Sequence, residues 1–103
     1  MYDVKFMDLA YEDYVEISEY LSRFYPSTPL KFLAELEKST AVLESTPYAF
    51  EVYEPIPQYR RMVVLGYLVF YKVLEEDRKV EIHRILHGAR NILNVLNKKE
   101  ESP

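Results

Sequence analysis

The sequence predicts an α+β fold in which a two-helix hairpin packs on a small, twisted, mainly antiparallel sheet. Three observations support this prediction. Residues 2–6 alternate apolar and polar side chains, as a short strand does. Two amphipathic helical patterns follow, and after them come three short segments rich in β-branched and aromatic residues. With a last helical pattern near the end, the predicted order is β-α-α-β-β-β-α.

Length and composition limit the class of protein. The 103 residues suit one domain spanning 1–103, with a polar tail from about residue 98. Hydrophobic residues make up 49% and charged residues 29%, which is typical of a folded chain, and the absence of cysteine excludes disulfides. The longest apolar stretch, residues 62–71, is about half of a membrane span, and the start lacks the apolar core of a secretory signal. We therefore expect a cytoplasmic protein with no membrane partner.

The two predicted helices each carry an apolar stripe. The first begins near Asp8, a candidate N-cap, and is closed by Pro26; the second restarts at Ser27-Thr28-Pro29, with a hydroxyl at the cap and proline at the first position. The first stripe consists of Ala10, Tyr14, Ile17, Leu21 and Phe24, and the second of Phe32, Leu33, Leu36, Thr40 and Leu43. The acidic residues expected on the solvated face of the first helix are Glu12, Asp13, Glu16 and Glu19.

The remaining elements follow a proline-spaced connection, residues 47–58, whose aromatic side chains we expect to lie on the body of the protein. Residues 59–65 and 67–74 flank Gly66, the best hairpin hinge in the chain. The central strand is apolar on both faces, as a buried strand should be. A polar turn at residues 75–78 leads to a strand over 79–86, and a last helix is predicted over 89–97.

Charge is unevenly distributed along the chain, which has a formal net charge of −4. Residues 1–58 contain four basic and eleven acidic residues, whereas residues 59–90 contain seven basic and four acidic ones. Two interpretations stay open. The two halves form faces with different partners, or helices simply collect solvated glutamate while strands collect arginine.

The best candidate for chemistry is a basic group in the second half of the chain. Arginine offers a planar fork of donors to phosphate oxygens, and histidine can transfer a proton near neutral pH. Arg61 and Arg84 on one sheet face would clamp a phosphate, with His87 as acid or base. The alternative is that the arginines pair with nearby glutamates and the histidine caps backbone. The candidate residues are Arg60, Arg61, Arg84, His87 and Arg90.

No cofactor or metal is predicted. Two glycines are too few for a phosphate-binding or dinucleotide-binding glycine loop. His83 and His87 have the spacing of two helical metal ligands, but they fall in a predicted strand, where residues four apart lie roughly 13 Å from each other.

Three segments carry a resemblance to a known family. They are Tyr59-Arg60-Arg61-Met62-Val63-Val64, Tyr67-Leu68-Val69-Phe70-Tyr71-Lys72-Val73 and Val80-Glu81-Ile82-His83-Arg84-Ile85-Leu86-His87-Gly88-Ala89-Arg90. In these segments the chain resembles the RelE/ParE superfamily, the toxins of type II toxin–antitoxin modules that include plasmid-stabilisation proteins. The resemblance covers nearly the whole chain and implies the same fold as the pattern analysis.

The superfamily has two activities, and the sequence favours one. RelE-like members cut messenger RNA in the ribosomal A site with basic residues on the sheet, and the five candidates above would be this chain's set. This chain departs from the RelE-like pattern at three positions. The pattern has an arginine where this chain has Leu68, and the next inward-facing position of the preceding strand is Met62 in place of a basic residue. The catalytic aromatic residue near the C-terminus has no counterpart, since Gly88 follows His87. The Leu86-His87-Gly88-Ala89-Arg90 ending resembles the ParE branch, which inhibits DNA gyrase without being enzymatic. The net charge of −4 also suits RNA poorly.

The resemblance further implies a cognate antitoxin whose extended or helical C-terminal segment wraps the toxin. The opening strand and the hairpin edge are candidates for strand addition, and the basic stretch of residues 59–90 is the expected contact surface because antitoxins are commonly acidic. A homodimer, a hetero-oligomer with the antitoxin, and a degenerate member that binds antitoxin without being toxic all stay open.

Overall fold

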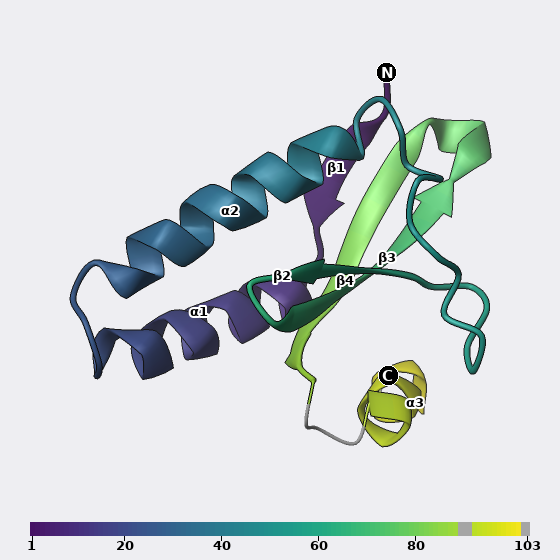
Figure 1. The fold of residues 1–103 in the computed structure, drawn as a ribbon. Helices are drawn as coiled ribbons and strands as arrows, with labels where there is room; N and C mark the ends of the chain where they lie inside the picture. Colours follow the sequence, from purple (N-terminus) through teal and green to yellow (C-terminus); the bar gives the residue numbers. More distant parts are fainter. Residues whose placement is uncertain (89–91, 102–103) are drawn as a thin grey trace.

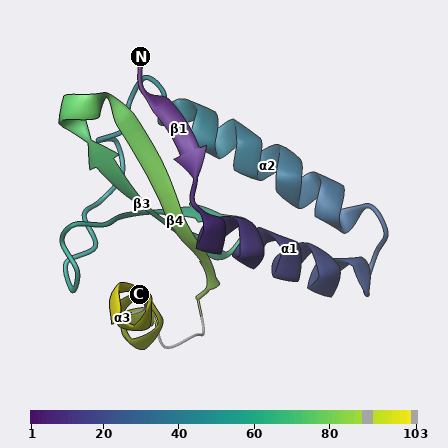
Figure 2. The same ribbon diagram turned by 180° about the vertical axis from the view of Figure 1, so that it is seen from behind.

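The computed structural model describes residues 1–88 and 92–101, with side chains through residue 96. The elements follow the predicted order. Figures 1 and 2 show the hairpin of α1 and α2 beside the sheet, and α3 apart from this hairpin. The elements are β1 (Asp3–Phe6), α1 (Asp8–Ser22), α2 (Thr28–Val42), β2 (Arg60–Val64), β3 (Tyr67–Leu74), a 3-10 turn (Glu75–Asp77), β4 (Lys79–His87) and α3 (Ile92–Glu101). The prediction of an α+β fold is confirmed.

The sheet has four strands in the order β1-β4-β3-β2. β1 runs parallel to β4, and the other two pairs are antiparallel, so the predicted mainly antiparallel character is correct. β1 pairs only with Lys79–Ile82, because it ends at Phe6. The second half of β4 therefore has no strand beside it on that side within the described residues. An irregularity between Phe70 and Tyr71 shifts the β3–β4 register by one residue there.

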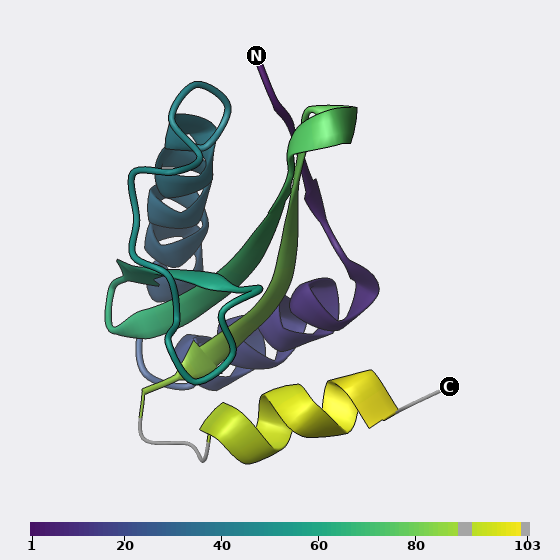
Figure 3. The same ribbon diagram turned by 90° about the vertical axis from the view of Figure 1, so that its right-hand side faces the viewer.

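The sheet separates two apolar cores. Neighbouring residues of β3 point to opposite faces, so Val69 and Tyr71 enter the core beneath the helical hairpin, whereas Phe70 enters the core beneath α3. The hairpin contributes Phe32 and Leu36 to the first core. α3, which Figure 3 shows from the side, contributes Leu96 to the second core.

The helix ends differ in detail from the predictions. Met7 occupies the N-cap position of α1, and Asp8 is the first helical residue. Ser27 occupies the N-cap of α2, as the hydroxyl-cap prediction allowed, but its side chain makes no capping hydrogen bond. α1 ends at Ser22, before Pro26, so Phe24 is outside the helix and 59% exposed instead of continuing the apolar stripe.

Three further predictions can be compared with the structure. Gly66 forms the β2–β3 turn with a φ of 84°. Leu65, the other residue of the turn, also has a left-handed backbone, with a φ of 47°. α3 runs from Ile92 to Glu101, so it continues past the predicted end at residue 97, whereas the predicted start over residues 89–91 lies outside the described residues. In the connection over residues 47–59, Phe50 packs against the first core and Tyr53 against the second, as expected, whereas Tyr48 is half exposed.

Candidate functional site

The two arginines of β2 point in different directions because neighbouring strand residues alternate between faces. Arg60 donates a hydrogen bond from Nη1 to the carbonyl oxygen of Phe50 at 2.7 Å and stacks 4.9 Å from the centre of the Tyr48 ring. Arg61 stands opposite Phe70 on β3 and lies 6.0 Å from the Tyr53 ring. Arg60 is therefore engaged by the connection over residues 47–59, and Arg61 belongs to the other face.

Arg84 is held in an ion pair with Asp13 of α1. Its Nε and Nη2 atoms donate to the two carboxylate oxygens at 2.7 and 2.8 Å, and Asp13 Oδ2 also accepts the backbone N–H of Ile85 at 2.9 Å. The hydrogen bonds from Arg84 to Asp13 are the main cause that raises the pKa of the guanidinium. The expectation that Asp13 lies on the solvated face of the helix is wrong. The β4 edge beyond Ile82 leaves an N–H group that this carboxylate satisfies.

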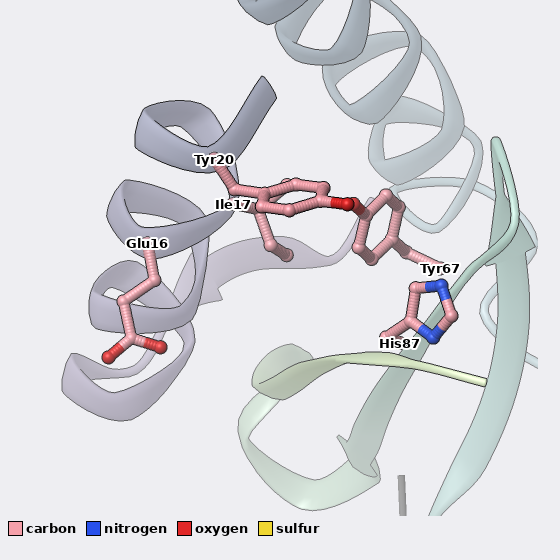
Figure 4. A pocket seen from close by; sticks show the side chains of 5 residues that line it. All are labelled: Glu16, Ile17, Tyr20, Tyr67 and His87. Atoms are coloured by element: carbon pink, nitrogen blue, oxygen red, sulfur yellow. The ribbon is translucent and has the colours of Figure 1, made fainter. Parts of the chain in front are cut away.

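His87 lines a pocket between α1 and the ends of β3 and β4 (Figure 4). The pocket has a volume of about 430 Å³, and its other lining residues are Glu16, Ile17, Tyr20 and Tyr67. The imidazole lies edge-on to the Tyr67 ring at 5.7 Å between centroids. Burial raises the pKa of the Tyr67 hydroxyl, and the nearby Tyr20 adds to the effect.

The described candidates do not converge on one point. Register places Arg61, Phe70 and Arg84 in one row across three strands, so the two arginines share a row as the phosphate-clamp hypothesis required. The guanidinium of Arg84, however, turns to Asp13. Arg90 lies outside the described residues, and the catalytic assignment stays a prediction.

A second polar cluster joins three distant segments and was not predicted from the sequence. Glu75 Oε1 accepts hydrogen bonds from the hydroxyls of Tyr2 and Tyr48, both at 2.6 Å. Arg78 donates to Glu75 Oε2 at 3.1 Å and to the Tyr2 hydroxyl at 3.0 Å. The hydrogen bond from Tyr2 is the largest cause that lowers the pKa of Glu75, and the hydrogen bond from Tyr48 is the second. The contacts of Glu75 with Tyr2 and Tyr48 join residues 73 and 27 positions apart, so no local sequence pattern predicts them.

The two histidines lie in different surroundings. His83 Nε2 is 2.9 Å from Glu81 Oε1, and its ring is edge-on to Tyr59 at 5.6 Å. Among the described residues no group of three or more histidine, aspartate or glutamate side chains has a geometry that would hold a metal ion. No described helix is long and apolar enough to span a bilayer.

A helical hairpin packs on one face of a mixed four-stranded sheet, and Arg60 and Arg84 are engaged by a carbonyl and a carboxylate of the same chain, so the fold and the site define a class of small α+β domain. The comparisons identify the family. The family model described as "ParE toxin of type II toxin-antitoxin system, parDE" matches residues 4–92. The chain belongs to this family of ParE toxins, within the RelE/ParE superfamily.

Solved structures have the same fold at low sequence identity. The chromosomal ParDE toxin–antitoxin system from P. aeruginosa matches with a TM-score of 0.72 and 16% identity, over 84% of this chain and 96% of that one. The isolated E. coli RelE toxin matches with a TM-score of 0.60 and 18% identity, over 99% and 100%. An E. coli RelE double arginine-to-alanine mutant, in complex with a RelB antitoxin peptide, matches with a TM-score of 0.56 and 16% identity, over 93% of each chain. No curated protein matches the sequence.

Proposed function

We propose that this ParE-family toxin acts by binding and inhibiting DNA gyrase, and that a cognate antitoxin neutralises it. The family match over residues 4–92 is the observation that carries this proposal. The site geometry adds support because inhibition by binding does not require a cluster of cations around a scissile bond.

The alternative is a RelE-like messenger-RNA endonuclease, which the likeness to the E. coli RelE fold favours. In this chain, Arg84 would have to leave two hydrogen bonds to a buried carboxylate before it reached a phosphate. Breaking a buried ion pair costs about 3–5 kcal/mol. Removing one transition-state donor typically costs a further ~3–4 kcal/mol of catalysis. Arg61, His87 and Arg90 would remain as the functional groups of such an enzyme.

The antitoxin is proposed to add a strand or helix along the toxin surface. The two edge strands of the sheet are β1 and β2. The connection over residues 47–59 already approaches β2, since Val52 pairs with Arg60 and the Arg61 N–H donates to the Glu51 carbonyl at 3.0 Å. β1 therefore presents the more accessible edge for strand addition. The RelE structure bound to an antitoxin peptide gives a precedent for such a complex in a related fold.

Inducing the protein without its antitoxin distinguishes the candidates. Gyrase inhibition predicts a DNA-damage response while early translation continues, and loss of supercoiling when the purified protein is added to gyrase. Rapid translation arrest with cleaved transcripts would contradict this and support the endonuclease. If growth is unaffected although the adjacently encoded small protein binds, the chain is a non-toxic member of the family.

For the endonuclease, the double change Arg84→Ala and His87→Ala should abolish toxicity while antitoxin binding weakens only modestly. Folding must be checked by circular dichroism, because Arg84 also has a structural partner in Asp13. Arg61→Ala is a useful companion, since no ion pair holds Arg61 within the described residues and its guanidinium lies 6.0 Å from the Tyr53 ring. Toxicity that survives both variants would contradict the catalytic assignment.

A further inference from the structure

The exposed side of α1 carries a stripe of charged side chains. Residues 12, 16, 19 and 23 are spaced four, three and four apart, which places them on one side of the helix. The stripe consists of Glu12, Glu16, Glu19 and Arg23, all of which are exposed. Figure 4 shows the Glu16 carboxylate turned away from the pocket tyrosines. Arg23 is the C-cap of α1 and keeps helical backbone angles, so it continues the stripe by one position beyond the helix.

The charge changes sign along this stripe. Residues 11–19 contain four acidic residues and no basic one, whereas residues 20–34 contain two basic residues and no acidic one. Within the described residues, no ion pair reaches Glu19 or Arg23. One exposed surface therefore carries a cation together with anions of the kind that would pair with it.

The end of α1 also exposes aromatic and aliphatic side chains. Tyr20 is 51% exposed, Phe24 59%, and Tyr25 and Leu30 are each 70% exposed. The rings of Tyr20 and Phe24 lie edge-on to each other at 5.1 Å between centroids. Figure 1 shows this turn between α1 and α2 at the end of the hairpin that points away from the sheet. Large apolar side chains grouped on a surface mark a contact site for another macromolecule.

A two-fold pairing of this surface brings opposite charges together. When two copies of α1 cross antiparallel at their C-terminal ends, Arg23 of each copy stands opposite Glu19 of the other, so the ion pair forms twice. The same crossing sets the two helix dipoles against each other and covers Tyr20 and Phe24 of both copies. A nucleic acid fits this surface less well, because the glutamates of the stripe repel phosphate.

We propose that the protein forms a two-fold dimer through the end of α1, with Arg23 paired with Glu19 of the second copy and the Tyr20 and Phe24 rings packed between them. The inference does not depend on the proposed inhibition of gyrase. Gyrase and a nucleic acid are the competing occupants of this surface, and the test separates them from a second copy.

Sedimentation velocity of the purified full chain, over a series of increasing concentrations, measures the dimer. The mass should rise from that of the monomer toward twice that value. Arg23→Glu should raise the Kd of the dimer about tenfold or more, because two attractions become repulsions. Adding Glu19→Arg to this variant should restore most of the affinity, since the exchanged charges pair again. Phe24→Ser should also weaken the dimer, because it removes an aromatic contact.

The matched control is Lys38→Glu, which makes the same change of charge on the exposed side of α2 and should dimerise as the wild type does. Circular dichroism checks that every variant is folded. A chain that stays monomeric throughout the series would overturn the proposal. Arg23→Glu that dimerises as tightly as Lys38→Glu would do the same, and so would a charge exchange that restores no affinity.

Two further results would overturn the proposal by assigning the surface to another occupant. A monomeric protein that loses gyrase inhibition in Arg23→Glu but keeps it in Lys38→Glu would assign the surface to gyrase. A monomeric protein whose binding to a single-stranded oligonucleotide is abolished by Arg23→Glu alone would assign it to a nucleic acid. The measurement of mass needs no gyrase, so failure of the proposed function and failure of this inference are observed separately.

Discussion

Arg84 of β4 and Asp13 of α1 form a two-pronged ion pair, with N–O distances of 2.7 and 2.8 Å, between residues 71 positions apart. The same carboxylate accepts the Ile85 N–H at 2.9 Å. One aspartate thus neutralises a cation and satisfies a backbone N–H on a strand edge that β1 does not reach. This contact ties the helical hairpin to the sheet and removes one arginine from the group available to a ligand.

Asp13→Ala should lower the free energy of unfolding by about 3–5 kcal/mol, because it leaves a nearly buried guanidinium and a backbone N–H without their acceptor. Urea denaturation measures the change as a shift in midpoint at constant slope. Glu12→Ala on the exposed side of the same helix should change stability by less than about 0.5 kcal/mol.

The double variant Asp13→Leu with Arg84→Met provides an internal test of the same contact. Replacing both members of a buried pair with apolar side chains is often neutral, so it should recover most of the loss. If Asp13→Ala unfolds no more easily than Glu12→Ala, the ion pair is not formed in solution.

Leu65→Gly should stabilise the protein by about 1 kcal/mol. Leu65 has φ 47° and is 59% exposed, so its side chain contributes little burial while its backbone pays the left-handed penalty of ~1–2 kcal/mol. Glycine relieves that penalty, although its greater freedom in the unfolded chain returns part of the gain. Thermal unfolding measures the effect, and Leu65→Ala is the control, because alanine keeps the penalty. An equal gain from alanine would point to removal of exposed apolar surface instead.

Stability should fall at acid pH partly through Glu75. Hydrogen bonds from Tyr2 and Tyr48 lower the pKa of Glu75 in the folded state, so this stabilisation is present above the unfolded pKa of about 4.3 and is lost as pH falls through the lower folded pKa. Glu75→Gln should flatten the stability profile below about pH 4.3.

The measurement is the urea midpoint of each variant from acid to neutral pH. Glu76→Gln is the control with the same charge change one residue later, and it should keep the wild-type profile. Identical profiles for wild type and Glu75→Gln would show that the tyrosine hydrogen bonds do not form.

Tyr71 should ionise later than an ordinary tyrosine. Burial raises its pKa to about 12, and its hydroxyl donates to the Pro47 carbonyl at 2.7 Å. Because the folded pKa lies above the unfolded value of about 10, the stabilisation is complete below pH ~10 and is lost as pH rises toward 12. Absorbance at the tyrosinate band should show a late-titrating group that disappears in Tyr71→Phe. A titration curve unchanged by this substitution would contradict the assignment.

Local patterns determined the elements of this fold and their order. The alternation in residues 2–6, the apolar stripes of the two helices and the residues around Gly66 depend on neighbours within a few positions, and the structure has strands, helices and a turn there. Helix ends were less accurate, since Met7 rather than Asp8 caps α1. Caps depend on backbone geometry that residue type only biases.

The family resemblance was also present in the sequence, because it rests on ordered motifs along the chain, and the family match over residues 4–92 confirms it. The burial and the partner of each charged residue could not be predicted from the sequence. Asp13 looks like its acidic neighbours on a helix, yet it is buried because β1 ends at Phe6 and leaves the Ile85 N–H facing α1.

Only the tertiary structure decided which arginines are engaged and where the pocket between α1 and the ends of β3 and β4 opens. Arg60 and Arg61 are adjacent in sequence but face opposite sides of the sheet. Glu75, in the turn between β3 and β4, contacts Tyr2, which lies 73 residues earlier in the chain. Short-range preferences determine the backbone elements, whereas long-range pairing, burial and strand register determine the partner of each charge. The sequence motifs therefore identify the family, whereas the pairing of Arg84 with Asp13 depends on the tertiary structure.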